Sequence, residues 1–136
     1  MDVADRVVLI TGASSGVGAA LAEQLAGMGS RVVVNYSRSA DAAEAVVSRI
    51  SAAGGQALAV QADVSEQADC QRLVAATIEQ FGRLDVLVNN AGTTTFVPHD
   101  QLDALTEEIW LRTLRVNLIG AFMMSREVAP LSLIHI

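Results

Sequence analysis

Glycines and hydroxyl side chains gather in one short segment near the N-terminus, where residues 11–18 read Thr-Gly-Ala-Ser-Ser-Gly-Val-Gly. Glycine lacks a Cβ, so the backbone of such a segment can approach a phosphate closely and can adopt a positive φ in a tight turn. Serine hydroxyls add hydrogen-bond donors for phosphate oxygens. The segment predicts a pyrophosphate-binding turn, and the alternative is a glycine-rich turn that binds no ligand. The residues concerned are Gly12, Ser14, Ser15, Gly16 and Gly18.

The spacing of the glycines restricts the kinds of nucleotide ligand that this segment could bind. It is Gly-x-x-x-Gly-x-Gly rather than the Gly-x-Gly-x-x-Gly of the common dinucleotide fingerprint. No Lys-Ser or Lys-Thr pair follows the last glycine, as a nucleoside triphosphatase would require. The segment therefore disfavours triphosphate hydrolysis and leaves dinucleotide binding open.

The elements around this segment alternate between strand and helix. Residues 6–11 are apolar and β-branched, which predicts a strand buried on both faces. A helix is expected over 16–28, ended by Gly29, with an apolar face formed by Val17, Ala20, Leu21, Leu25 and Met28. The glycine segment thus lies where a strand turns into a helix, the position at which doubly wound sheets bind dinucleotides.

The same rhythm continues along the chain. Strands are expected at 31–36, 56–61 and 84–89, and helices at 40–53 and from the N-cap Ser65 to Phe81. A polar loop over 93–105 leads to a long helix that Thr106 caps and that runs toward Pro130. These alternating elements predict an α/β fold, a Rossmann-type doubly wound parallel sheet, truncated after about four strands and the following long helix.

Composition limits the partners and the compartment. The 136 residues carry a net charge of −6, which argues against nucleic acid as a partner because phosphate-backbone binding needs a basic face. The single Cys70 is expected to be a small buried hydrophobe in a reducing compartment. His99 lies in a loop without a cluster of other ligand residues and does not predict a metal site. Charged residues interrupt the N-terminus and no apolar run of about 18 residues follows, so we expect a cytoplasmic protein without a membrane partner.

Two motifs together carry a family resemblance. Thr11, Gly12, Gly16 and Gly18 match a Thr-Gly-x-x-x-Gly-x-Gly pattern, and residues 89–92 read Asn-Asn-Ala-Gly after the fourth expected strand. On these motifs the sequence resembles the short-chain dehydrogenase/reductase family. Residues 34–39 are most similar in sequence to its 3-oxoacyl-[acyl-carrier-protein] reductase branch. Extended epimerase/dehydratase relatives space their glycines Gly-x-x-Gly-x-x-Gly, which does not fit.

The resemblance implies an oxidoreductase that transfers hydride between a nicotinamide dinucleotide and a small-molecule carbonyl or alcohol. It places Asn90, Ala91 and Gly92 along the cofactor and lets Asn89 brace the sheet. It further implies Asp63 and Val64 beside the adenine, and Val17 with the glycine segment at the cofactor. A homodimeric or homotetrameric parent protein is also implied, in which Trp110 and Phe122 would be core or dimer-packing aromatics.

Asn117, within Val-Asn-Leu at 116–118, corresponds to the active-site asparagine of the family. By resemblance it holds a proton-relay water near the catalytic lysine. The alternative is an asparagine whose side chain is satisfied within a helix packing surface.

The end of the second expected strand bears on cofactor choice. An acidic residue there would bind a ribose 2′-hydroxyl and repel a 2′-phosphate. The neighbourhood consists of Asn35, Tyr36, Ser37 and Arg38, and no carboxylate occurs until Asp41. Because the planar guanidinium suits a phosphate, we expect NADP(H) to be favoured over NAD(H). Alternatively, Arg38 opens the next helix on a solvated face, and the glycine segment lacks the basic residue that some NADP-dependent relatives carry.

The catalytic residues of the family are missing from these 136 residues. The family uses a serine, a tyrosine as general acid/base, and a lysine four residues after the tyrosine. The only tyrosine, Tyr36, has no lysine at that spacing. We expect residues 1–130 to be the N-terminal part of an NAD(P)-binding Rossmann domain, inactive alone. The alternative is a non-catalytic dinucleotide-binding or regulatory module.

The last six residues, 131–136, read Leu-Ser-Leu-Ile-His-Ile. Codons that could encode them resemble the transposon mosaic-end adapter used in sequencing libraries, so we expect a non-native tail from adapter read-through. Alternatively, this apolar segment is the fifth strand of the sheet.

Overall fold

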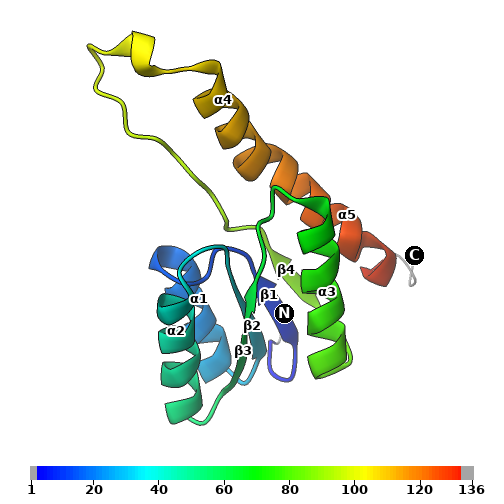
Figure 1. Cartoon of the computed structure of the whole chain (residues 1–136). Coiled ribbons are helices and arrows are strands. Elements are labelled where there is room, and N and C mark those ends of the chain that lie inside the picture. The colour runs from blue at the N-terminus through cyan, green and yellow to red at the C-terminus, as the bar shows by residue number, and fades with distance from the viewer. Residues whose placement is uncertain (1–2, 133–136) are drawn as a thin grey trace.

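A single parallel sheet positions the glycine segment. The computed structural model describes residues 3–132, and its four strands lie in the order β3-β2-β1-β4. Their bounds are β1 (Val7–Ile10), β2 (Arg31–Tyr36), β3 (Gln56–Gln61) and β4 (Val86–Val88). The chain starts at β1 in the interior of the sheet, adds β2 and β3 on one side and then returns to add β4 on the other (Figure 1). The expected α/β class, a doubly wound parallel sheet, is confirmed.

Helices cover both faces of the sheet. They are α1 (Gly16–Gly27), α2 (Ala40–Ala52), α3 (Gln67–Phe81) and, after the fourth strand, α5 (Ala121–Ser132). Val8 and Ile10 pack with α1 and α2, whereas Leu9 packs on the opposite face with α3 and α5. Figure 1 shows α1 and α2 on one face of the sheet and α3 and α5 on the other. Because successive side chains of a strand point to opposite faces, this two-sided burial explains why the strands are continuously apolar.

The buried face of α1 differs from the expected one. Its buried residues are Gly18, Ala19, Ala22 and Ala26, whereas Val17 is 78% exposed and Met28 is also exposed. The predicted face is wrong for Val17, Ala20 and Met28, whereas Leu21 and Leu25 are partly buried and pack against the core. The small side chains face inward, which lets α1 lie close to the sheet at the glycine segment.

Two element boundaries also differ. Ser65 is not the N-cap of α3, which starts at Gln67 after Glu66. The Ser65 hydroxyl instead donates to Asp63 and accepts from Arg112. The strands expected at 6–11 and 84–89 are shorter, since the ladder covers only Val7–Ile10 and Val86–Val88. Cys70 is fully buried as expected, and burial raises the pKa of its thiol to about 11.

The segment after β4 forms a helical arm, defined here as residues 93–132. It contains a short 3-10 turn (Leu102–Ala104), α4 (Glu107–Leu114), a π-helical segment (Arg115–Gly120) and α5. Thr106 caps α4 as expected, because its hydroxyl accepts a hydrogen bond from the backbone N–H of Ile109 at 3.4 Å. Figure 1 shows α4 standing away from the sheet while α5 lies beside α3. Of the expected non-native tail, Leu131 and Ser132 belong to α5, and 133–136 lie outside the described residues.

Candidate functional site

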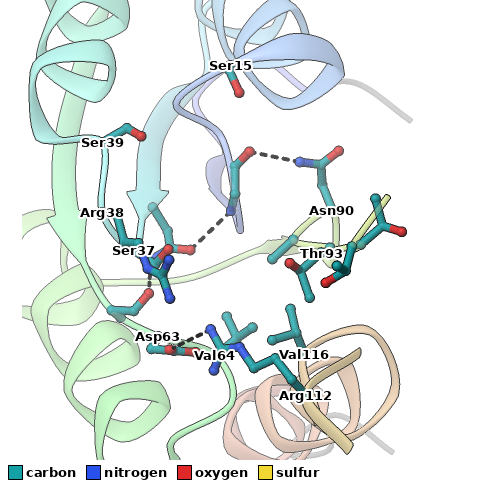
Figure 2. A pocket seen from close by; sticks show the side chains of 17 residues that line it. Ser15, Ser37, Arg38, Ser39, Asp63, Val64, Asn90, Thr93, Arg112 and Val116 are labelled. Carbon is teal, nitrogen blue, oxygen red and sulfur yellow. Dashed lines mark hydrogen bonds and ion pairs between the residues drawn. The ribbon is translucent and has the colours of Figure 1, made fainter. Parts of the chain in front are cut away.

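A pocket of about 670 Å³ lies at the carboxyl ends of the strands. Its volume falls in the range of roughly 300–1,000 Å³ that small-molecule and cofactor pockets span. It is lined by Gly12, Ser15, Asn35, Ser37, Arg38, Ser39, Ala62, Asp63, Val64, Asn90, Ala91, Gly92, Thr93, Thr94, Thr95, Arg112 and Val116. Figure 2 shows Ser37, Arg38 and Ser39 on one side of the pocket and Asn90 and Thr93 on the other. Ten of the sequence-predicted cofactor residues are among the lining residues.

Packing dictates two of the three glycines of the segment. A Cβ on Gly12 would come within 2.8 Å of the Ala91 Cα, and one on Gly18 within 2.5 Å of the Asn90 amide nitrogen. The third, Gly16, has a φ of +56° and no atom within 4 Å of its would-be Cβ. The open space at Gly16, at the N-terminus of α1, fits the approach of a phosphate group to backbone N–H groups.

The Asn-Asn-Ala-Gly motif is bonded directly to the glycine segment. The Asn90 side chain donates to the carbonyls of Thr11 at 2.9 Å and Gly12 at 3.0 Å. In return, the Thr11 hydroxyl accepts from the backbone N–H groups of Asn90 and Ala91, both at 3.0 Å. Beside this contact, Asn89 donates to the Ser125 hydroxyl at 3.1 Å and joins the end of β4 to α5. The two sequence motifs therefore form one structural unit.

Asn35 anchors the glycine segment from the other side. Its side chain is buried, and its Oδ1 accepts from the Gly12 N–H at 3.1 Å. Its Nδ2 donates to the carbonyls of Tyr36, Val60 and Ala62 at 3.1–3.3 Å. The sequence predicted Asn35 as a cofactor residue, and the structure places its amide between the turn and the ends of β2 and β3. A polar residue directly after the apolar run 32–34 was the available signal for this role.

The edge of the pocket after β2 is polar and includes an unpaired cation. Ser37, Arg38 and Ser39 are all exposed. Within residues 3–132, the Arg38 guanidinium makes no hydrogen bond or ion pair, and Ser39 precedes α2 without capping it through its side chain. Ser37 is held by its carbonyl, which accepts from the Gln61 amide at 3.0 Å. This edge therefore presents one guanidinium and two hydroxyls to whatever binds there.

The opposite end of the pocket contains an ion pair between α4 and the β3–α3 connection. The Asp63 carboxylate accepts from the Ser65 hydroxyl at 2.6 Å and pairs with Arg112 at 3.2 Å. Burial raises the pKa of Asp63, but the hydrogen bonds from Ser65 and Arg112 outweigh burial and leave the pKa below 3.8. Sequence reasoning missed Arg112, because a pair 49 residues apart has no local signal.

Asn117 lies in the π-helical segment. Its side chain accepts from the Thr93 N–H at 2.7 Å and donates to the Thr93 carbonyl at 3.0 Å. This pair of bonds ties the π-helical segment to the first residue of the arm, directly after Gly92. Of the predicted site residues, Ser14, Gly16, Val17, Gly18, Tyr36 and Asn117 do not themselves line the pocket.

The described residues offer neither a metal-binding cluster nor a membrane-spanning helix. Among residues 3–132, no three His, Cys, Asp or Glu side chains are close enough to hold a metal ion, and His99 is exposed. No helix in that described part combines the length and the hydropathy needed to cross a lipid bilayer.

Comparisons with known proteins agree with the motifs. The family model described as short chain dehydrogenase matches residues 6–134. A 3-oxoacyl-[acyl-carrier-protein] reductase of Synechocystis is 44% identical over 94% of this chain and 51% of its own length. The short-chain dehydrogenase/reductase homolog YusS of Bacillus subtilis is 46% identical over 80% of this chain and 100% of its own length.

A crystal structure of a short chain dehydrogenase from Burkholderia cenocepacia in complex with NADP is similar, with a TM-score of 0.86 and 38% identity. The match covers 96% of this chain and 52% of that one. The chain spans about half the length of the first curated relatives that it matches. Two linked motifs, the parallel sheet and the family match over residues 6–134 lead to one conclusion: the chain belongs to the short chain dehydrogenase family, whose members bind a nicotinamide dinucleotide.

Proposed function

We propose that this chain is the N-terminal, cofactor-binding part of an NADP(H)-dependent oxidoreductase that acts on a carbonyl or alcohol. The observation that carries the cofactor preference is the edge formed by Ser37, Arg38 and Ser39, which offers an unpaired guanidinium and two hydroxyls. No carboxylate precedes Asp41 after β2. A 2′-phosphate would gain charge-assisted hydrogen bonds at this edge.

The other predicted cofactor residues can be assigned along an extended dinucleotide. The turn at Gly16 and the N-terminus of α1 would hold the pyrophosphate, with Ser14 and Ser15 as further donors. Asp63 and Val64 would lie beside the adenine. Asn90, Ala91 and Gly92 would follow the remainder of the cofactor, whose nicotinamide ring supplies or accepts the hydride when bound.

The catalytic step needs residues that this sequence does not contain. Besides Tyr36, no tyrosine occurs among the 136 residues, and they contain no lysine. We therefore propose that the chain alone does not turn over substrate. Its contribution to the proton relay would be Asn117, which the two bonds to Thr93 hold close to the pocket-lining threonines.

Self-association is the third part of the proposal. Trp110, Leu114, Leu118 and Phe122 are all at least 44% exposed and follow one another along the helical arm. Exposed apolar side chains in such a row are typical of interaction surfaces. We propose that a second copy of the parent protein covers them in a homodimer or homotetramer in the cytoplasm. The non-native tail at 131–136 stays a prediction, which resequencing the gene would test.

Titration of the 136-residue chain with NADPH and NADH tests the cofactor preference. We expect tighter binding of NADPH. Arg38→Gln should weaken NADPH binding about ten-fold and NADH binding less than about two-fold, because only NADPH carries the 2′-phosphate. Arg115→Gln removes the same charge outside the pocket and is the matched control. Tighter binding of NADH by the unmodified chain would refute the preference.

One comparison favours a second candidate function. The match to YusS covers that whole protein, so a relative of similar length to this chain exists. A non-catalytic dinucleotide-binding or regulatory module is consistent with it. Oxidation of NADPH with a panel of aldehydes and ketones, by this chain and by the protein encoded at the complete locus, separates the two. Turnover only by a longer product supports the fragment, and a native stop codon after residue 136 supports the module.

A further inference from the structure

Arg112 connects the helical arm to the pocket. One nitrogen of its guanidinium donates to the Ser65 hydroxyl at 3.0 Å and another to the Asp63 carboxylate at 3.2 Å. Within residues 3–132, these are the only hydrogen bonds that run from α4 to a strand or to the β3–α3 connection. Since α4 otherwise stands away from the sheet (Figure 1), Arg112 fixes it over the pocket.

The contacts of Asp63 leave one acceptor position open. Its Oδ1 accepts from both the backbone N–H and the hydroxyl of Ser65, at 2.9 and 2.6 Å. Within residues 3–132, its Oδ2 accepts only from Arg112, and a carboxylate oxygen has two lone pairs. Asp63 lines the pocket together with Val64 and Val116, two apolar side chains that can flank a planar base (Figure 2).

Ser65 and Arg112 hold different oxygens of Asp63. Both bonds from Ser65 go to Oδ1, so without Arg112 the carboxylate would be held at one oxygen only. The second guanidinium contact fixes the other oxygen, so the open acceptor position has a defined direction. The Ser65 hydroxyl is also fixed, because it donates to Asp63 while accepting from Arg112.

We propose that Arg112 is a positioning residue that holds the Asp63 carboxylate ready to accept from an amino group on the bound base, so that α4 sets the selectivity of the pocket for adenine. The inference rests on the proposed function, in which Asp63 lies beside the adenine. A purine with an oxygen in place of the 6-amino group presents an acceptor to this carboxylate and is disfavoured.

The experiment compares NADPH with its hypoxanthine analogue, in which oxygen replaces the 6-amino group. Dissociation constants are measured for the unmodified chain and for Arg112→Met, Arg112→Lys and Arg115→Met. Arg112→Met should weaken NADPH binding about five- to ten-fold and binding of the analogue less than about two-fold. Arg112→Lys keeps the charge without the planar fork and should give an intermediate ratio. Arg115→Met, an exposed site in the next turn, should leave the ratio unchanged.

The ratio of the two constants is the decisive readout. A variant that is partly unfolded weakens both ligands by the same factor, so its ratio stays at the unmodified value. If the unmodified chain prefers NADPH and Arg112→Met keeps that preference, the role of Arg112 is refuted while the proposed function stands. Equal binding of the two dinucleotides by the unmodified chain also refutes it. If the unmodified chain binds neither dinucleotide, the proposed function itself fails.

Discussion

Two regions of the molecule bury their apolar side chains to very different degrees. One is the sheet together with α1, α2 and α3, and the other is the helical arm. Every residue of β1 and the run Val32–Val34 of β2 are at most 1% exposed. In contrast, nine of the eleven large apolar side chains exposed among residues 3–132 belong to the arm, with Phe96 at 89%. The apolar side chains of the sheet region are covered by other parts of the same chain, whereas most of those on the arm are not.

The total surface reflects the same difference. The accessible area is 8101 Å², compared with about 6,800 Å² for a typical folded monomer of 14.3 kDa. The arm meets the rest of the chain through a few buried residues, Val116, Met123 and Met124 among them, and through polar links at Arg112 and Ser125. The sheet region thus buries most of its large apolar side chains, while the arm contributes only a few of its own to the core.

The largest effect is expected from removing the amide that anchors the glycine segment. Asn35→Leu leaves the Gly12 N–H and the carbonyls of Val60 and Ala62 without this partner. The free energy of unfolding should fall by about 2–4 kcal/mol, measured by urea denaturation. Asn89→Leu removes one exposed hydrogen bond to the arm and should cost less than about 1 kcal/mol. Equal losses from the two substitutions would contradict the contrast between the two regions.

A smaller effect, with opposite signs at two sites, is expected within α1. Gly18→Ala puts a Cβ 2.5 Å from the Asn90 amide and 2.9 Å from the Gly12 carbonyl, and should destabilise the chain by about 1–3 kcal/mol. Gly27→Ala meets nothing within 4 Å and should be neutral or stabilising by up to about 1 kcal/mol. Thermal unfolding of both variants measures the difference. Destabilisation by Gly27→Ala alone would show that the close approach at Gly18 does not limit packing.

The smallest effect on stability is expected in the arm. Leu118 is 64% exposed, so Leu118→Gln should change the unfolding free energy by less than about 0.5 kcal/mol. The same substitution should reduce self-association in sedimentation experiments, because it places a polar amide in the proposed contact with a second copy. A loss of stability above about 1 kcal/mol in a monomeric chain would show that the arm has a hidden packed face.

Sequence patterns predicted the elements with local signals. Apolar β-branched runs located the strands, glycines located the turns, and the Thr106 cap located the start of α4. The inward face of α1 was predicted only in part: Leu21 and Leu25 pack against the core. Hydrophobicity also favours Val17 and Met28, whereas close packing on the sheet favours Ala22 and Ala26. Ser65 was taken for a cap because its competing partners, Asp63 and Arg112, meet it only in the folded chain.

Within the site, sequence separation limited what could be predicted. The glycine segment and the Asn-Asn-Ala-Gly motif could each be recognised in the sequence. The hydrogen bonds between Asn90 and Thr11 that join them could not be predicted. The same holds for Asn35, whose amide satisfies four backbone groups that no local pattern brings together.

The π-helical segment Arg115–Gly120 determines how α5 is rotated about the helix axis relative to α4. A regular helix turns by about 100° per residue, so one residue more or fewer rotates the following segment by that angle relative to the preceding one. If the same six residues formed regular α-helix instead, α5 would turn by about 100° relative to α4, because each residue of a π-helix turns less than a residue of an α-helix. Met124 would then leave the face next to α3, and the exposed row on the arm would be broken between Leu114 and Phe122. The π-helical segment therefore sets the rotation of α5 relative to α4. With this rotation, Met124 faces α3 while the exposed apolar row continues from α4 into α5.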